Sequence, residues 1–510
     1  MSKGLYTVLA ILALLAVAAG LRFYSLDLME FKQDEVLALS KTGEIFSSGK
    51  VPSVGLVSSV GIYNPPVFLY ILALCSFLVS TPVGFALVVA LGGMLAILIL
   101  AYLSAVYAGR SGMVFLLILS AASPWMVIYS RKIWAQNLLL PLVALLVTAL
   151  LRLSEKPRTR AAVLIFPLLA LIFGLHFSGV AVAIATLIFI VLAVKITELN
   201  KKALLAGLAP AIAILSPYLL YLVKSGFSDL GAVLSAIEKI KTPILAVLYD
   251  SVKRTGEVFF IGGSNWIMDN QFTRAQPLID GSAALLSKAG AWIVWFIVLL
   301  FGAGAFGFAA QSKDGFFAAF RERRAQLLCF LFVLTPVVFY GILGIKLYNH
   351  YFIISIPPVF LAVSIAFSKA FGETKRLFLP HAALFIRALI ALFSAGFFIC
   401  GALWLLTCYR YIESEGGTRG DYGEAFRYQA QAAEYILERS SEKTKVKYYS
   451  LRDSGVGVKY LIEESKDKNP QLAEEGAKEI RVINTLVSSR KCPKETTEEK
   501  KIGAYIVCRM

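Results

Sequence analysis

The sequence predicts a polytopic, all-helical membrane protein with about eleven transmembrane helices and a small soluble α/β domain at its C-terminal end. Of the 510 residues, 58% are hydrophobic, and the mean hydropathy of +0.72 lies far outside the range of soluble globular proteins. Apolar runs long enough to cross a bilayer recur along residues 1–408. Residues 409–510 are polar by comparison, which indicates a separate soluble domain.

The first predicted helix begins close to the N-terminus. The apolar run Leu5–Leu21 is barely long enough to span a bilayer at about 1.5 Å per residue. No small-residue cleavage site follows it before Arg22, so we expect an uncleaved helix rather than a signal peptide. Ten further runs have the length and composition of spans: 84–107, 113–129, 138–153, 161–176, 179–195, 203–223, 288–310, 326–345, 352–369 and 383–408.

One further apolar stretch, Val67–Val79, decides the topology. Its length of about thirteen residues suits a re-entrant or interfacial segment better than a span. If it does not cross, four basic loops share the side of the N-terminus, as the positive-inside rule requires: 152–160, 195–202, 313–324 and 369–376. We therefore expect a plasma-membrane protein with a cytoplasmic N-terminus, eleven spans and an extracytoplasmic tail.

The net charge of +17 follows from the same rule. Its basic residues lie in short loops between spans and form no clustered basic face, so nucleic acid is excluded as a partner. The excess of Lys and Arg also favours contact with anionic membrane lipids. The predicted outer side collects two long loops, at about 22–83 and 224–287, together with the tail.

The tail predicts an extracytoplasmic α/β module. Its alternating apolar residues indicate strands, and one stretch indicates a helix: strands at 445–450, 480–487 and 502–507, and a helix at 456–464. Cys492 and Cys508 both lie in this tail and would be free to pair outside the cytoplasm, which the sequence leaves open. No cysteine or histidine spacing points to zinc.

Adjacent carboxylates, Asp34 and Glu35, follow the first helix by about a dozen residues, at the predicted membrane–water boundary. A carboxylate in this position can accept a proton from a hydroxyl or amine during group transfer. Asp34 would equally serve as the N-cap of a helix over 36–46, and spacing alone favours the cap.

Basic and aromatic residues meet at two predicted outer corners. Arg131 and Lys132 stand beside Tyr129 and Trp134, a combination that suits a lipid phosphate and equally suits interfacial anchoring. The corner Lys346–Tyr351 repeats the pattern with Tyr348, Asn349 and His350. His176, at the end of its helix, is a third candidate, although a lone histidine is more often a structural hydrogen-bonding group.

These features together resemble a known family. The pattern Arg22–Asp27 followed by Gln33–Glu35 resembles the first external loop of the type-C (GT-C) glycosyltransferases. The resemblance is greatest to the branch that holds protein O-mannosyltransferases and the lipid A aminoarabinose transferase. Further similar patterns occur in the expected order: Asn64-Pro65-Pro66 with Tyr70, Ser123-Pro124-Trp125 running to Ser130-Arg131, His176-Phe177, His350-Tyr351-Phe352 with Pro357, and Gly420-Asp421-Tyr422-Gly423.

The resemblance implies an enzyme that transfers a monosaccharide from a polyprenyl-phosphate donor to a lipid, glycan or protein acceptor outside the cytoplasm. It assigns the catalytic base to Asp34, with Glu35 beside it. The position and chemistry of four residues imply that they hold the donor phosphate: Arg131, Lys132, Lys346 and His350. Five more are expected to contact substrate: Tyr63, Asn64, His176, Tyr348 and Asn349. A single base and one displacement would invert the anomeric centre.

The sequence departs from the family at the second outer corner. Many relatives carry a second acid shortly after the arginine, and here Gln136 and Asn137 stand instead. This departure implies transfer without a metal cofactor, although Asp34 with Glu35 could still bind a divalent ion weakly.

Two other function classes share this size and charge. A transporter or flippase of lipid-linked sugars would show paired inverted repeats and midplane charges, and we find no such duplication. A non-catalytic assembly factor would tolerate the loss of Asp34. Polar residues gathered at one face favour chemistry, whereas polar residues at both faces would favour transport.

Overall fold

The computed structural model describes most of the chain. The described residues are 3–58, 61–229, 231–232, 235, 243–260, 267–312, 316–377, 380–439, 444–449, 455–468, 478–486 and 491–509.

Helices form most of the described residues between Lys3 and Glu415. The α-helices described in this part of the chain are α1 (Lys3–Phe23), α2 (Gln33–Ser48), α3 (Val67–Cys75), α4 (Pro82–Ala121), α5 (Pro124–Tyr129), α6 (Leu139–Glu155), α7 (Ile165–Leu175), α8 (Gly179–Ala193), α9 (Lys201–Lys224), α11 (Ile244–Glu257), α12 (Asn270–Ala275), α13 (Pro277–Gln311), α14 (Phe316–Glu322), α15 (Arg324–Leu343), α16 (Ile356–Leu377) and α17 (Pro380–Glu415). Short 3-10 helices lie between them: η1 (Leu26–Leu28), η2 (Ala135–Leu138), η3 (Arg160–Leu164), η4 (Ile196–Glu198) and η6 (Asn349–Ser355).

Eight of the described helical segments are long and apolar enough to cross a membrane, and they contain α1, α4, α6, α9, α13, α15, α16 and α17. Two shorter apolar segments, 160–175 and 179–193, contain α7 and α8. The chain is therefore a multi-pass integral membrane protein. Together with the two arms of α4, these helices occupy the positions of the predicted spans. The number of spans, eleven, stays a prediction.

Helix α4 reverses direction at Gly109, whose φ of +69° departs from the helical region. In a straight helix, residues eight apart lie about 12 Å apart along the axis. A Cβ atom placed on Gly112 would nevertheless lie 3.0 Å from the hydroxyl of Ser104. The predicted spans 84–107 and 113–129 are thus two antiparallel arms, the second of which ends at Ala121 and is followed by α5.

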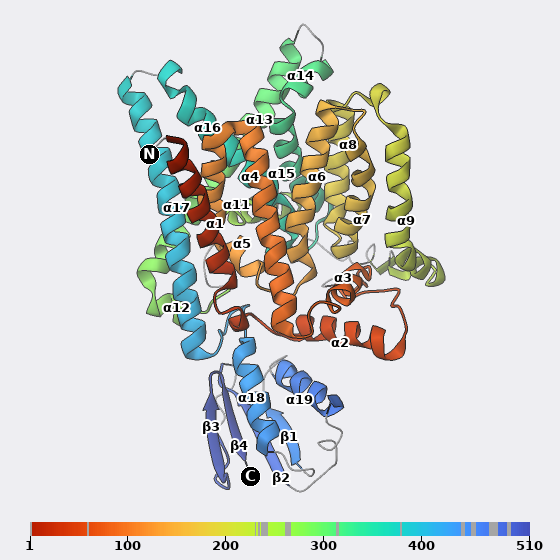
Figure 1. Cartoon of the computed structure of the whole chain (residues 1–510), viewed down its shortest axis with the longest axis vertical. Coiled ribbons are helices and arrows are strands. Elements are labelled where there is room, and N and C mark those ends of the chain that lie inside the picture. Colours follow the sequence, from red (N-terminus) through yellow and green to blue (C-terminus); the bar gives the residue numbers. More distant parts are fainter. Residues whose placement is uncertain are drawn as a thin grey trace.

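The doubtful stretch Val67–Val79 forms the short helix α3. Its nine residues rise only about 13 Å, which is less than half of a bilayer core. It packs against α2 and α7 at one end of the bundle (Figure 1). The prediction that this segment is too short to span agrees with the structure.

The C-terminal domain lies beyond α17, beside the end of the bundle that holds α2 (Figure 1). It contains α18 (Phe426–Arg439), α19 (Val456–Lys468) and a four-stranded sheet of order β1-β2-β4-β3. The strands are β1 (Thr444–Tyr449), β2 (Lys478–Asn484), β3 (Glu498–Ile502) and β4 (Tyr505–Arg509). Strands β1 and β2 are parallel, and the other two pairs are antiparallel.

The predicted elements of the tail agree with β1, β2 and α19 but miss α18. The strand predicted at 502–507 overlaps β4 but starts three residues too early, and β3 was not predicted, because Gly503 has φ +51° and turns the chain between β3 and β4. Only glycine adopts this conformation without strain. Helix α17 continues to Glu415, so the predicted boundary at 408 falls inside a helix.

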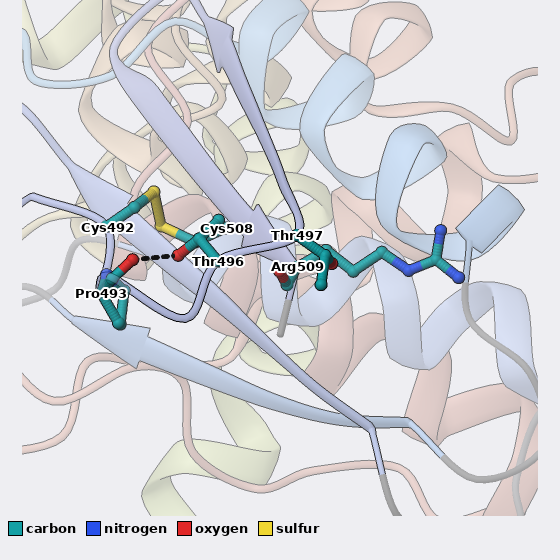
Figure 2. Close-up of a disulfide and its surroundings, with 6 residues drawn as sticks. All are labelled: Cys492, Pro493, Thr496, Thr497, Cys508 and Arg509. Atoms are coloured by element: carbon teal, nitrogen blue, oxygen red, sulfur yellow. Dashed lines mark hydrogen bonds between the residues drawn. A yellow bond between two sulfur atoms is a disulfide. The ribbon is translucent and has the colours of Figure 1, made fainter.

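A disulfide joins Cys492 and Cys508, whose Cα atoms are 5.7 Å apart. Figure 2 shows how it ties β4 to the segment before β3, where the Thr496 hydroxyl also donates to the Pro493 carbonyl. The pairing that the sequence left open is therefore present. A disulfide is typical of an extracytoplasmic domain.

We predict that Cys492→Ala/Cys508→Ala loosens this domain. A bridge that closes a loop with a sequence separation of 16 residues stabilises by about 3 kcal/mol. Limited proteolysis of the full chain in detergent should then cleave within residues 416–510 faster, by up to about 100-fold. Cys75→Ala/Cys400→Ala, which removes two unpaired membrane cysteines, is the matched control. Equal cleavage of both double variants would contradict the prediction.

Candidate active site

A cavity of about 700 Å³ opens at the end of the bundle next to the C-terminal domain. Its walls come from five parts of the chain: the first turn of α2, the segment after α5, α11, η6 and the segment between α17 and α18. The lining residues are Lys32, Gln33, Asp34, Glu35, Lys132, Trp134, Arg254, Tyr348, Asn349, His350 and Asp421. Folding thus gathers charged residues that are hundreds of positions apart.

Asp34 is exposed on the cavity wall, in the first turn of α2. The helix begins at Gln33, earlier than the predicted start at Val36, and Lys32 holds the N-cap position. The alternative role of Asp34 as N-cap is therefore wrong. It is Glu35 that closes this helix end, since its Oε2 accepts the backbone N–H of Lys32 at 2.9 Å.

Glu35 is completely buried, although it directly follows the exposed Asp34. Its Oε1 lies 3.4 Å from the ammonium of Lys132. Burial raises the pKa of Glu35 to about 7; Lys132 opposes this shift, and Glu30 adds to it. The two neighbouring carboxylates therefore have different environments, one open to the cavity and one enclosed.

Lys132 is held between two carboxylates. Its Nζ lies 2.7 Å from Glu30 Oε1 and 4.5 Å from the centre of the Trp134 ring. Burial alone would lower the pKa of Lys132, but Glu30 and Glu35 outweigh that effect and raise it. Lys132 is therefore a permanent cation on the cavity wall.

Another part of the lining is Arg254 from α11. Its Nε lies 2.8 Å from Asp250 Oδ2, and its Nη1 donates to the side-chain oxygen of Asn349. Sequence analysis missed Arg254, because an acid four residues before an arginine is an ordinary pair on an exposed helix. Nothing in the local sequence indicates that α11 faces the cavity.

Aromatic rings form the third wall. The rings of Trp134 and His350 lie with centroids 4.7 Å apart, and Tyr348 stacks on His350 at 5.5 Å. His176 lies behind His350, at 5.7 Å, and does not line the cavity. Its Nδ1 accepts the backbone N–H of Ser178 at 3.1 Å, which fixes the orientation of the imidazole.

The structure brings six of the predicted site residues to the cavity: Asp34, Glu35, Lys132, Tyr348, Asn349 and His350. Five others lie outside its lining: Tyr63, Asn64, Arg131, His176 and Lys346. Five lining residues were not predicted as site residues: Lys32, Gln33, Trp134, Arg254 and Asp421.

Arg131 points away from the cavity and into the end of α1. Its guanidinium donates to a set of carbonyl oxygens at 2.6–3.4 Å, those of Leu21, Arg22, Tyr24 and Ser25. It also lies 4.5 Å from the centre of the Tyr409 ring. Because these contacts occupy the guanidinium, its geometry does not support the predicted phosphate role.

Three other predicted residues have structural contacts instead. Asn64 Nδ2 donates to the Leu56 carbonyl at 3.0 Å and closes the turn before α3. The Tyr63 carbonyl accepts the Tyr218 hydroxyl at 3.1 Å. The side chain of Lys346 is exposed, with Nζ 5.2 Å from the centre of the Tyr348 ring.

Metal ligands do not cluster within the described residues: no group of three or more His, Cys, Asp or Glu side chains is placed to hold an ion. Asn137, which stands in place of a second acid, donates from Nδ2 to the Lys132 carbonyl at 2.9 Å. Its side chain braces the segment that carries Lys132.

The raised pKa of Glu35 predicts a pH-dependent stability. A carboxyl group whose pKa rises from 4.5 to about 7 on folding stabilises the fold below pH 4.5, and this contribution is lost as the pH rises through 7. Glu35→Gln keeps an acceptor for the Lys32 amide but removes the titration. Thermal unfolding gives the free energy of unfolding of wild type and variant. The difference between the two free energies should change across this pH window by roughly 3 kcal/mol. Glu44→Gln, exposed on the same helix, is the control. A difference that stays constant from pH 4.5 to 8 would contradict the assignment.

Comparison with known proteins now adds to this geometry. No protein-family model matches the sequence, and no curated protein matches it significantly. Two crystal structures of ArnT from Cupriavidus metallidurans are similar over 100% of this chain and 98% of theirs, with a TM-score of 0.52. The identity is 13% for the form bound to undecaprenyl phosphate and 14% for the apo form.

The oligosaccharyltransferase of Archaeoglobus fulgidus, in complex with Zn and sulfate, is similar over 93% of this chain and 68% of its own. Its identity is 13% and its TM-score 0.47. At such low sequence identities, structural similarity shows a shared fold and nothing more. The full-length match shows that the chain has an ArnT-like fold, which agrees with the predicted GT-C type of architecture.

Proposed function

We propose that this protein is a membrane glycosyltransferase that moves a monosaccharide from a polyprenyl-phosphate donor to a lipid, glycan or protein acceptor. The observation that carries the proposal is the cavity itself: the exposed carboxylate of Asp34 shares it with Lys32, Lys132 and Arg254. A base and several cations in one cavity beside apolar helices suit a substrate with a lipid tail and a phosphate head. The ArnT fold, seen there with undecaprenyl phosphate bound, supports the same substrate class.

In the proposed reaction Asp34 acts as general base. It accepts the proton of the acceptor hydroxyl or amine while the acceptor atom bonds to the anomeric carbon of the sugar. The bond between that carbon and the phosphate oxygen breaks, and the polyprenyl phosphate leaves with the bonding electrons. One displacement of this kind inverts the anomeric centre.

The leaving phosphate is stabilised by the cavity cations. Lys132 and Arg254 come from separate walls and are already oriented by Glu30, Glu35, Asp250 and Asn349. Cations fixed before the reaction stabilise developing negative charge without reorganising. Arg254 takes the place that Arg131 and Lys346 held in the prediction, because those two lie outside the cavity lining.

The proposed orientation puts this cavity on the extracytoplasmic face. The N-terminus of α1 and α14 lie at the end of the bundle opposite α2 and the C-terminal domain (Figure 1). The basic loop at 313–324, which contains α14, then faces the cytoplasm as the positive-inside rule requires. The disulfide of the C-terminal domain also fits an oxidising compartment.

We predict that Asp34→Asn abolishes transfer. Loss of a general base lowers the rate by about 10²- to 10⁴-fold. Membranes that carry wild type or variant are given a panel of radiolabelled polyprenyl-phosphate sugars, and label in the acceptor fraction is counted. Glu44→Gln, an acid lost from the exposed face of the same helix, should transfer as wild type does.

Two outcomes would contradict this function. Equal transfer by Asp34→Asn and wild type would remove Asp34 from the chemistry. Donor that crosses the bilayer without transfer of its sugar would favour a flippase.

We predict that Arg254→Gln weakens donor binding and also slows turnover, because Arg254 is proposed to hold the phosphate and to stabilise its developing charge. Truncation of a charge-assisted hydrogen bond costs about 1.5–3 kcal/mol, so KM for the donor should rise by roughly 10- to 100-fold. Lys253→Gln, at an exposed neighbouring position, is the control and should keep its KM. An unchanged donor KM in Arg254→Gln would place the phosphate elsewhere.

A further inference from the structure

The segment that leads into α2 is bonded to a segment from the far end of the chain. Glu30 and Ala425 form an antiparallel bridge, flanked by hydrogen bonds from Phe31 N to Glu424 O at 3.4 Å and from Phe426 N to Met29 O at 2.9 Å. The residues before Asp34 are therefore fixed by the chain that enters the C-terminal domain.

Glu30 is the bridge residue, and its side chain is 6% exposed. One oxygen, Oε1, lies 2.6 Å from the Nζ of Lys32 and 2.7 Å from the Nζ of Lys132. Glu30 does not itself line the cavity, whereas both lysines do. Its carboxylate therefore reaches the cavity only through these two cations.

Further contacts lock this pairing. The Gln429 side chain donates to the carbonyls of Phe31 and Glu424 at 2.7 and 3.2 Å. The rings of Phe31 and Phe426 pack edge to face at 5.2 Å. Gln429 and Phe426 belong to α18, so the first helix of the C-terminal domain holds the pairing in place.

The same incoming segment also contacts Lys32 directly. The Lys32 ammonium donates to the Asp421 carbonyl. Gly423 has φ +68°, and a Cβ atom there would lie 2.7 Å from Lys32 Cδ. The chain before α18 thus shapes the space in which Lys32 lies.

The charge balance shows what Glu30 does. The acidic groups near the two lysines include Glu30, Asp34, Glu35, Asp421 and Glu424, and the two ammonium groups also repel each other. If the charge of Glu30 were removed, the nearest remaining carboxylate would be Glu35 for Lys132 and Asp421 for Lys32. Each ammonium would be drawn to a new position, although both would stay in the cavity.

We propose that Glu30 is a positioning residue for Lys32 and Lys132, and that its pairing with Ala425 makes docking of the C-terminal domain a condition for an ordered cavity. The inference rests on the proposed function, because it assigns the two lysines to the phosphate of that substrate. It goes further by giving the C-terminal domain a direct part in building the site.

Glu30→Gln, which keeps size and removes charge, tests the proposal. A misplaced group at a reacting centre lowers the rate by about 100-fold, so we expect kcat to fall by roughly 10- to 100-fold. The donor KM should rise as well, because displaced cations also hold the bound phosphate less well. Glu30→Asp keeps the charge and should be faster than Glu30→Gln; equal rates would show that the charge is not needed.

A double-mutant cycle with Lys132→Gln separates positioning from misfolding. If Glu30 acts through Lys132, the double variant is little slower than Lys132→Gln alone. The proposal would be overturned if the loss of kcat in the double variant equalled the product of the two single losses. A kcat of Glu30→Gln within twofold of wild type would also overturn it. Asp27→Asn breaks the partly exposed ion pair with Arg427 at the same junction. This pair contacts neither lysine, so kcat should stay within about twofold of wild type.

The same cycle is measured in the Kd for undecaprenyl phosphate, which needs no turnover. A wild type that binds this lipid but transfers no sugar fails the proposed function, and the binding cycle still tests Glu30. Coupling between Glu30 and Lys132 in Kd is the expected result. Independent effects of the two substitutions would overturn the inference, and absence of binding by wild type would overturn both.

Discussion

The end of α1 is the constraint on which the site depends. A helix leaves its last carbonyl groups without partners, and lipid offers none. Arg131 donates to the carbonyls at this end, while Arg22, inside α1, donates to the carbonyls of Ser120 and Ala121 at the end of α4. The two arginines fasten the helix ends together. Because Lys132 follows Arg131 directly, the same contacts bring it to Glu30.

Adjacent residues can then take different tasks. Neighbours in a helix point about 100° apart, so Asp34 faces the cavity while Glu35 turns into the protein. Likewise Arg131 is committed to backbone carbonyls, and Lys132 is held beside the cavity by Glu30 and Glu35. Structural and chemical roles therefore alternate along short segments.

Sequence reasoning predicted what is local and missed what folding brings together. The apolar runs located the membrane helices, and a stretch as short as Val67–Val79 was recognised as too short to cross, because length and hydropathy decide both. The roles of Arg131 and Lys132 could not be separated, since two adjacent cations look alike until their partners are known. Glu30 and Arg254 gave no signal, because the partners that tie them to the cavity, Lys132 and Asn349, lie in distant segments.

The most direct test of the proposed site is a structure of the full chain in lipid nanodiscs with undecaprenyl phosphate bound. We expect the phosphate between Lys132 and Arg254, with the carboxylate of Asp34 facing the place of the departed sugar. A phosphate bound at the opposite end of the bundle, among the basic residues of the 152–160 or 313–324 loops, would contradict it.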